Sequence, residues 1–305
     1  MRFFHNLKNI DDSCKNAVAV IGNFDGVHSG HMHVLQTALD IAKKRNKPSL
    51  LLTFEPHPDA FFRPAAEKFR ITPVHAKVRA VSTVGLDALC VLRFDSALAE
   101  MSASDFVKDV LVNGLHVSHI VVGQDFCFGK KREGNAAFLK KNFPDLPVTF
   151  VEQLRDKTGE IISSSRIRSF IRDGRTERAA NLLGRPFEME GRVIHGFKRG
   201  RTIGFPTLNI APNASIIPKI GVYAAKILID NEPYDGIANI GFRPTVQGTN
   251  VLLEAHIFDF DRDIYGKRVR VQLFSFIREE KRFSSLDELK QKIIADSAKA
   301  KEILK

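Results

Sequence analysis

The sequence has no tryptophan, only three tyrosines and only three cysteines among its 305 residues. The cysteines, Cys14, Cys90 and Cys127, are odd in number and include no CxxC pair, so neither a disulfide framework nor a zinc site is indicated. Cys90 lies in the apolar run ALCVL, where we expect a buried small hydrophobic residue. Unpaired cysteines are typical of a reducing compartment, so we expect the protein in the cytoplasm.

Long apolar runs are also missing. None approaches the roughly 18 residues that a membrane-spanning helix needs, so we expect no membrane partner. The N-terminal region has no uninterrupted apolar stretch and contains Asp11 and Asp12, which argues against a secretory or transit signal. The composition, 44% hydrophobic and 27% charged, is that of a globular protein.

Basic residues are in excess, with 46 Lys and Arg against 35 Asp and Glu, a net charge of +11. Such a surplus attracts anions, which include nucleic acid, lipid and phosphorylated metabolites. An RNA-binding protein with a β-barrel module is one alternative, but it would need exposed aromatic rings for base stacking. Tryptophan is absent and most phenylalanines lie in apolar runs, so we expect no nucleic-acid partner.

The first half of the chain alternates short apolar runs with longer helical patterns. Strands are predicted at residues 17–21, 49–54, 88–94 and 119–122, and helices at 31–45, 73–84 and 103–113. This alternation predicts an α/β fold with a Rossmann-like parallel sheet covered on both faces. In such sheets ligands bind at the carboxyl ends of the strands.

From about residue 187 to 277 the chain has five β-rich runs with no helix between them, which predicts an antiparallel barrel or sandwich. A terminal helix follows, with Ser284 or Ser285 as its cap and Glu288 in its first turn. We expect its apolar residues to pack against the barrel: Leu286, Leu289, Ile293, Ile294, Ile303 and Leu304. The predicted domains are residues 1–182 and 183–305.

The segment GNFDGVHSGH, residues 22–31, follows a predicted strand and opens a predicted helix. His28 and His31 are three residues apart, so both imidazoles lie on one side of the helix start. Glycines let backbone N–H groups approach a ligand, and a helix N-terminus favours phosphate. Two histidines on one phosphate would stabilise the charge that builds up during displacement at phosphorus.

Three further segments lie at or near the expected ligand edge: TFEPHP (53–58), GQDFCFGKKREG (123–134) and SSSRIR (163–168). Serine hydroxyls, backbone amides and a guanidinium group together form a cradle for a triphosphate. By itself, SSSRIR is equally explained as a helix N-cap.

The second half carries its own set of polar residues. A glycine-rich basic loop precedes Pro206-Thr207-Leu208-Asn209, where Thr207 and Asn209 face the same way on an extended segment and offer oxygen ligands for Mg²⁺. Glu254 lies within the apolar strand VLLEAHIF, where a carboxylate is costly unless it is paired or at a site. An edge-strand glutamate pointing to water is the alternative interpretation.

Taken in order and spacing, GNFDGVHSGH, TFEPHP, VVGQDFCFGKKREG and ISSSRIR resemble the adenylyltransferase half of the bacterial bifunctional riboflavin kinase/FMN adenylyltransferases, a member of the HxGH nucleotidyltransferases. The segments RTIGFPTLNI, NIGFRPTV and LEAHIFDFDRDIYGK resemble the riboflavin kinase module of the same family, a six-stranded antiparallel barrel with a terminal helix. Other HxGH enzymes, such as cytidylyltransferases and pantetheine-phosphate adenylyltransferases, lack the fused barrel.

The resemblance implies an enzyme that phosphorylates riboflavin with ATP to FMN and then adenylylates FMN to FAD, with Mg²⁺ serving both steps. Its partners would be ATP, riboflavin and FMN, and weak self-association is allowed. Ser165 stands where the family usually has threonine, which keeps the hydroxyl, and Met32 stands where glutamine is frequent.

The same resemblance implies roles for individual residues. The catalytic residues would be the transition-state-stabilising His28 and His31 and the base Glu254. Nucleotide and phosphate binding would involve Gly22, Asn23, Phe24, Asp25, Ser164, Ser165, Arg168, Gly196, Lys198, Gly204 and Pro206. Flavin binding would involve Phe54, Pro56, His57, Asp125, Phe128 and Arg278, and the Mg²⁺ ligands would be Thr207 and Asn209.

Overall fold

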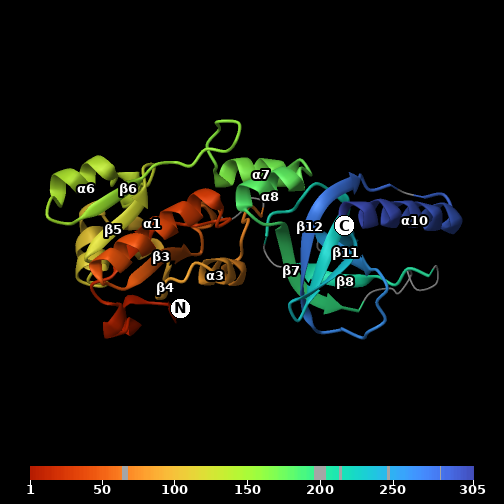
Figure 1. The fold of residues 1–305 in the computed structure, drawn as a ribbon, viewed down its shortest axis with the longest axis horizontal. Helices are drawn as coiled ribbons and strands as arrows, with labels where there is room; N and C mark the ends of the chain where they lie inside the picture. The colour runs from red at the N-terminus through yellow and green to blue at the C-terminus, as the bar shows by residue number, and fades with distance from the viewer. Residues whose placement is uncertain (64–67, 196–203, 213–214, 246–247, 282) are drawn as a thin grey trace. The chain divides into compact units, whose positions relative to one another are not determined.

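The computed structural model of the protein describes residues 1–63, 68–195, 204–212, 215–245, 248–281 and 283–305. The chain packs as two compact units. The first comprises Met1–Ala66 and Val74–Ser163, and the second comprises Glu67–Pro73 and Ser164–Lys305. The first unit contains an open sheet and the second a barrel (Figure 1). The fold is therefore the predicted combination of a Rossmann-like α/β unit and an antiparallel barrel with a terminal helix.

The sheet of the first unit has six parallel strands in the order β1-β4-β3-β2-β5-β6. They are β1 (Arg2–Phe4), β2 (Val18–Ile21), β3 (Ser49–Glu55), β4 (Ala88–Arg93), β5 (His119–Gly123) and β6 (Val148–Val151). The four predicted strands are confirmed. The two edge strands β1 and β6 were not predicted, because each is short and only partly buried and therefore lacks a fully apolar run.

Helices cover both faces of this sheet. On one face, Val18, Val20 and Leu51 pack with residues of α1 (Ser29–Arg45) and α3 (Val74–Ser82). On the other face, Ala19 and Leu50 pack with α5 (Ala103–Asp105), the π-helical segment Phe106–Val112 and α6 (Ala136–Asn142). The shorter helical segments of this unit are Leu7–Asn9, Asp12–Cys14, α2 (Pro58–Phe62), α4 (Ser96–Glu100) and Lys130–Arg132.

Cys90 lies on β4 and is 0% exposed, as predicted for a small hydrophobic residue. Its burial raises the pKa of the thiol to about 12, so Cys90 stays protonated and unreactive.

The main part of the second unit consists of α7 (Ser164–Arg172), α8 (Thr176–Leu183) and a closed barrel in the order β10-β11-β8-β7-β12-β9. All its strand pairs are antiparallel. The strands are β7 (Phe187–Ile194), β8 (Leu208–Pro212), β9 (Gly221–Ile229), β10 (Glu232–Thr245), β11 (Gly248–Ile257) and β12 (Arg268–Arg278). Five correspond to the β-rich runs, and the sixth, β8, contains Asn209.

The chain ends in α10 (Leu286–Ile303), capped by Ser285, whose hydroxyl accepts a hydrogen bond from the Glu288 N–H at 3.1 Å. Ile293, Ala300 and Leu304 pack on β9 and β10 of the barrel. The prediction of one apolar stripe is wrong for Leu286, Ile294 and Ile303, which are 66%, 44% and 36% exposed. At about 100° per residue Ile294 points away from the face that carries Ile293, whereas Leu286 has the same direction as buried Leu304 and is exposed at the first position of the helix.

Candidate active sites

The HxGH turn of the first unit joins the end of β2 to the start of α1. His28 is the N-cap of α1, and its Nδ1 accepts a hydrogen bond from the His31 N–H at 3.2 Å. The two imidazole rings are stacked, with centroids 3.6 Å apart and planes 16° apart. His28 is 5% exposed and His31 is partly buried. The structure therefore brings the two predicted histidines together at a helix N-terminus, where the helix dipole favours an anion.

Two glycines of the turn are needed for close packing. A Cβ atom at Gly22 would lie 2.9 Å from the ring of Phe24, and one at Gly30 would lie 3.2 Å from the ring of His28. The Phe24 ring also contacts that of His31, with centroids 4.8 Å apart. Glycine at these positions thus lets the rings pack against the backbone of the turn.

A buried polar cluster joins this turn to two other elements. The ammonium group of Lys77, on α3, donates to the Asn23 carbonyl oxygen at 2.6 Å and lies 3.1 Å from the Thr53 hydroxyl. Thr53, at the end of β3, donates to the same carbonyl at 3.1 Å. Sequence reasoning missed Lys77 and Thr53. The available signal was a lysine four residues before Val81, on the buried face of a predicted helix.

Two of the predicted flavin-binding residues lie in an aromatic cluster. Phe54 on β3 and Phe128 are each 8% exposed. Both pack on Phe106, with ring centroids 6.2 Å and 5.5 Å apart. The structure thus connects TFEPHP and GQDFCFGKKREG through a shared hydrophobic core.

The remaining flavin-binding candidates of this unit differ in exposure. His57 is 6% exposed and caps α2, since its Nδ1 accepts a hydrogen bond from the Asp59 N–H at 3.1 Å. Pro56 and Asp125 are exposed, and one carboxylate oxygen of Asp125 would lie 3.0 Å from a Cβ at Gly123. Asp125 lies two residues after the end of β5, at the carboxyl end of the sheet.

The predicted triphosphate-binding residues Ser164, Ser165 and Arg168 belong to α7 in the second unit. Ser164 and Ser165 form the first turn of this helix. Arg168 donates from Nε to the Phe69 carbonyl oxygen at 2.9 Å, and its guanidinium lies over the Phe69 ring. Arg168 therefore also links Phe69 to α7.

The barrel has its own polar site on its outer face. Glu254 on β11 is directly opposite Asn209 on β8 and Asn239 on β10. Its neighbours Leu253 and Ala255 are 0% exposed inside the barrel, so Glu254 points outward. Side chains opposite one another on antiparallel strands lie about 4.5–5.5 Å apart at Cβ, so these three oxygen-bearing groups share one face. The sequence analysis did not identify Asn239 as a site residue. Its neighbours Ala238 and Ile240 are buried, so the Asn239 side chain faces outward.

A cavity of about 410 Å³ lies beside the PTxN segment, and its described lining does not include Glu254, Asn209 or Asn239. Its lining includes Pro206, Thr207 and Leu208 from the PTxN segment, and Phe260, Asp261 and Tyr265 from the loop that follows β11. Thr207 immediately precedes β8, two residues before Asn209. Gly204, with φ 84°, makes the turn that leads into this segment. Two further nucleotide-binding candidates, Gly196 and Lys198, lie outside the described residues.

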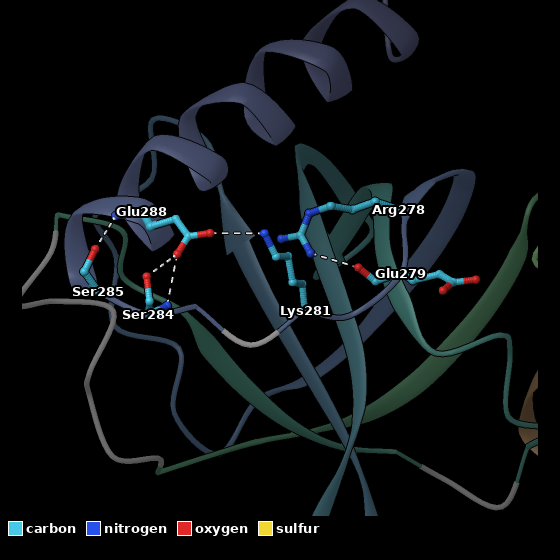
Figure 2. Close-up of polar contacts among 6 residues, drawn as sticks. All are labelled: Arg278, Glu279, Lys281, Ser284, Ser285 and Glu288. Atoms are coloured by element: carbon cyan, nitrogen blue, oxygen red, sulfur yellow. Dashed lines mark hydrogen bonds and ion pairs between the residues drawn. The ribbon is translucent and has the colours of Figure 1, made fainter.

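Arg278, the flavin-binding candidate of the second unit, lies at the end of β12. Its Nε donates to the carboxylate of Asp296 on α10 at 2.7 Å, and Asp296 is 2% exposed. Its Nη1 donates to the Glu279 carbonyl at 2.9 Å (Figure 2). The arginine is thus held by α10 at the point where the chain leaves the barrel.

The oxygen atoms of Thr207, Asn209 and Glu254 are hard donors of the kind that Mg²⁺ prefers. No group of three or more His, Cys, Asp or Glu side chains is arranged to hold a metal ion in the described part of the chain.

Across the residues that the structure describes, no helix is both long enough and apolar enough to span a membrane.

Comparison with known proteins gives each unit a family. Residues 10–166 match the model of the FAD synthetase family, and residues 183–304 match that of the riboflavin kinase family. The class defined by these matches is a two-module protein in which an FAD synthetase segment precedes a riboflavin kinase segment.

Relatives match along the whole chain. The bifunctional riboflavin kinase/FMN adenylyltransferase of Escherichia coli (strain K12) is 40% identical over 304 residues, covering 99% of this chain and 96% of the relative. That of Bacillus subtilis (strain 168) is 37% identical over 301 residues, covering 95% and 93%. This chain therefore belongs to the family of bifunctional riboflavin kinase/FMN adenylyltransferases.

A solved structure shares the fold over the full length. The crystal structure of a Streptococcus pneumoniae protein described as a macrolide-efflux protein has a TM-score of 0.89 and 33% sequence identity, and the match covers 98% of each chain.

Proposed function

We propose that this chain makes FAD from riboflavin in two ATP-dependent steps, carried out by modules at residues 183–305 and 1–182. First, the ribityl 5′-hydroxyl of riboflavin attacks the γ-phosphorus of ATP, and FMN and ADP leave. Then a phosphate oxygen of FMN attacks the α-phosphorus of a second ATP, and FAD and pyrophosphate leave. The observation that carries the proposal is that one chain of this family holds a stacked HxGH pair in one unit and Glu254 opposite Asn209 in the other.

In the kinase step, Glu254 would accept the proton of the attacking hydroxyl. Its position between Asn209 and Asn239 supports this role, since amide groups on both sides can orient a carboxylate. Thr207 and Asn209 would hold Mg²⁺, which their hydroxyl and carbonyl oxygens suit. When bound, the metal would neutralise charge on the ATP phosphates. Gly196, Lys198, Gly204 and Pro206 would shelter those phosphates, and Arg278 would lie against the flavin.

In the adenylyl step, His28 and His31 would donate hydrogen bonds to the reacting phosphate. The tautomer of His28 supports this, because a neutral ring whose Nδ1 accepts the His31 N–H carries its proton on Nε2. We infer that this Nε2–H is the group that donates to the phosphate. The turn residues Gly22, Asn23, Phe24 and Asp25 would bind the same nucleotide, and Ser164, Ser165 and Arg168 would bind its triphosphate.

FMN would bind near the aromatic cluster of the first unit. Phe54 and Phe128 offer apolar rings for the isoalloxazine, and Pro56, His57 and Asp125 lie on the loops that follow β3 and β5. The efflux description of the Streptococcus pneumoniae protein has no counterpart among the described residues of either site. We also propose a cytoplasmic location, which the three free cysteines support.

The test is to incubate the purified chain with riboflavin, ATP and Mg²⁺ and to separate the flavins by chromatography. We expect both FMN and FAD. Glu254→Gln should slow FMN formation about 10²- to 10⁴-fold while FAD still forms from supplied FMN. His28→Ala should do the reverse and stop the sequence at FMN.

Matched controls are available for both substitutions. Glu188→Gln removes a partly buried carboxylate on β7, and His33→Ala removes an exposed imidazole one turn along α1. Both should leave the two steps near the wild-type rate. If Glu254→Gln or His28→Ala leaves its own step within a few-fold of wild type, that assignment is wrong.

A further inference from the structure

The buried lysine next to the HxGH turn has no part in the reaction as described so far. Lys77 is 4% exposed, and Thr53 beside it is 0% exposed. Both side chains donate to one acceptor, the backbone carbonyl of Asn23, at 2.6 Å and 3.1 Å. The carboxyl ends of β2 and β3 and the helix α3 thus meet at a single peptide group.

An ammonium group at this position is costly if it only fills space. Burying a charge is unfavourable unless it is well hydrogen-bonded, and an apolar side chain would cover the sheet without that cost. Val81, one turn further along α3, is such a residue and is 0% exposed. The charge at Lys77 therefore calls for a role beyond packing.

The backbone of the turn supplies a reason for such a contact. Phe24 and Val27 have φ of 49° and 43°, in the left-handed region that non-glycine residues, and β-branched ones above all, rarely adopt. Such conformations persist only where the surrounding structure holds them. Lys77 and Thr53 hold the peptide group that directly precedes Phe24.

Anchoring this carbonyl also orients a hydrogen-bond donor. In a trans peptide the C=O and N–H groups point in opposite directions, so fixing the Asn23 carbonyl fixes the direction of the Phe24 N–H. A charged donor on the carbonyl further polarises the peptide and strengthens that N–H.

We propose that Lys77 is a positioning residue for adenylyl transfer, acting through the Asn23 carbonyl to hold the HxGH turn and its backbone amide in the orientation that binds the phosphates of ATP. The inference rests on the proposed function of this turn. Lys77 touches no reacting atom in this scheme. Its role is to keep the strained segment from relaxing between turnovers.

The principal test is Lys77→Met, which keeps an unbranched side chain of similar length and removes the charge. FAD formation from FMN should lose about 100-fold in kcat, the size expected when catalytic groups are misplaced by about 1 Å, with a smaller change in the KM for ATP. FMN formation from riboflavin, which takes place in the other unit, should stay within about twofold of wild type. The control is Ser49→Ala, which removes a buried hydroxyl bonded to Asp87 at 2.7 Å at the opposite end of β3.

A second pair of variants covers the case in which Lys77→Met unfolds, as judged by thermal melting. Thr53→Val keeps the shape of the side chain but removes the hydrogen bond to the same carbonyl and the hydroxyl that accepts from Lys77. FAD formation should fall at least tenfold in kcat, since one hydrogen bond is worth roughly tenfold. Thr53→Ser keeps the hydroxyl and should restore the rate.

Two results would overturn the inference. One is a folded Lys77→Met or Thr53→Val enzyme whose kcat for FAD formation is within threefold of wild type. The other is a parallel fall in FAD and FMN formation that follows the unfolded fraction, which is what a merely structural lysine would produce. If the wild-type protein makes no FAD, the proposed function is wrong, and this inference fails together with it.

Discussion

At the scale of single residues, the side chains and backbone of the HxGH turn are tightly packed. The ring of His31 stacks on that of His28 and also contacts the tilted ring of Phe24, and the backbone at Gly22 and Gly30 lies against the rings of Phe24 and His28. The acceptor Nδ1 of His28 is committed to the His31 N–H. A small displacement of either ring therefore changes the direction in which the Nε2–H points.

Gly30→Ala tests this crowding. The added methyl would lie 3.2 Å from the His28 ring and 3.6 Å from the Ile162 carbonyl oxygen, so the ring must shift by a few tenths of an ångström. We expect FAD formation to fall roughly tenfold, because catalytic groups tolerate little misplacement. FMN formation, measured in the same flavin assay, should not change.

Gly85→Ala is the matched control for this prediction. Gly85 has φ 87° but open space around its would-be Cβ, so alanine there strains the backbone of the turn that precedes β4 without crowding a ring. Equal losses of FAD formation in the two variants would mean that stability, not the His28 ring, accounts for the effect.

Residue types could be predicted at these sites, but their mutual contacts could not. The HxGH and PTxN segments and Glu254 are recognisable because their spacing or polarity departs from the local pattern. Lys77 and Asn239 look like ordinary members of a helix and a strand. Their importance follows from residues far away in the sequence: Lys77 is 54 positions from Asn23.

At the scale of elements, the start of α10 is held by several side-chain hydrogen bonds. The Glu288 carboxylate accepts hydrogen bonds from the Ser284 N–H at 3.0 Å, from the Ser284 hydroxyl at 2.8 Å and from Lys281 at 3.1 Å (Figure 2). With Ser285 as N-cap, this is a variant of the capping box in which the carboxylate reaches one residue further back.

These contacts make the helix start sensitive to acid. The hydrogen bonds from Ser284, followed by that from Lys281, lower the pKa of Glu288 from 4.5 to about 2. A carboxyl whose pKa is lower in the folded state stabilises that state above its unfolded pKa, and this contribution is lost as the pH falls towards the folded pKa. We expect the destabilisation caused by Glu288→Gln, measured by urea unfolding, to be full at pH 6 and to shrink from about pH 4.5 towards pH 2.

Glu302→Gln, at the other end of α10, is the control because it removes the same charge from an exposed site. A Glu288→Gln effect that is constant between pH 6 and pH 3 would contradict the prediction.

Periodicity predicted the central elements well and the edges poorly. The strands β2 to β5 are fully or largely buried, so their apolar runs identify them. The formation of the edge strands β1 and β6 and the burial of residues on α10 depend on which other elements pack against them. The local sequence does not indicate those elements.

At the scale of the whole molecule, the chain divides into two compact units, each with its own core and its own set of polar residues. The proposed steps use different residues, with the histidine pair in the first unit and Glu254 in the second, so each step should be separable from the other by a single substitution. FMN links the two as product of one and substrate of the other.

Mixing two inactive variants tests this arrangement. Neither Glu254→Gln nor His28→Ala alone should convert riboflavin to FAD, but an equimolar mixture should, because FMN made by the second variant is adenylylated by the first. The readout is FAD on chromatography. A mixture that accumulates FMN without FAD would mean that FMN is not exchanged between molecules. Boiling the Glu254→Gln protein before mixing is the control.

The amino-acid sequence by itself determined the order of elements, the chemistry of the HxGH and PTxN segments and the family, because these depend on spacing over a few residues at a time. Only the tertiary structure decided that Lys77 reaches the Asn23 carbonyl and that Asn239 flanks Glu254. The first contact depends on how α3 packs beside the turn after β2, and the second on the register of β10 and β11. Both are determined by the packing of the whole core rather than by any local sequence pattern.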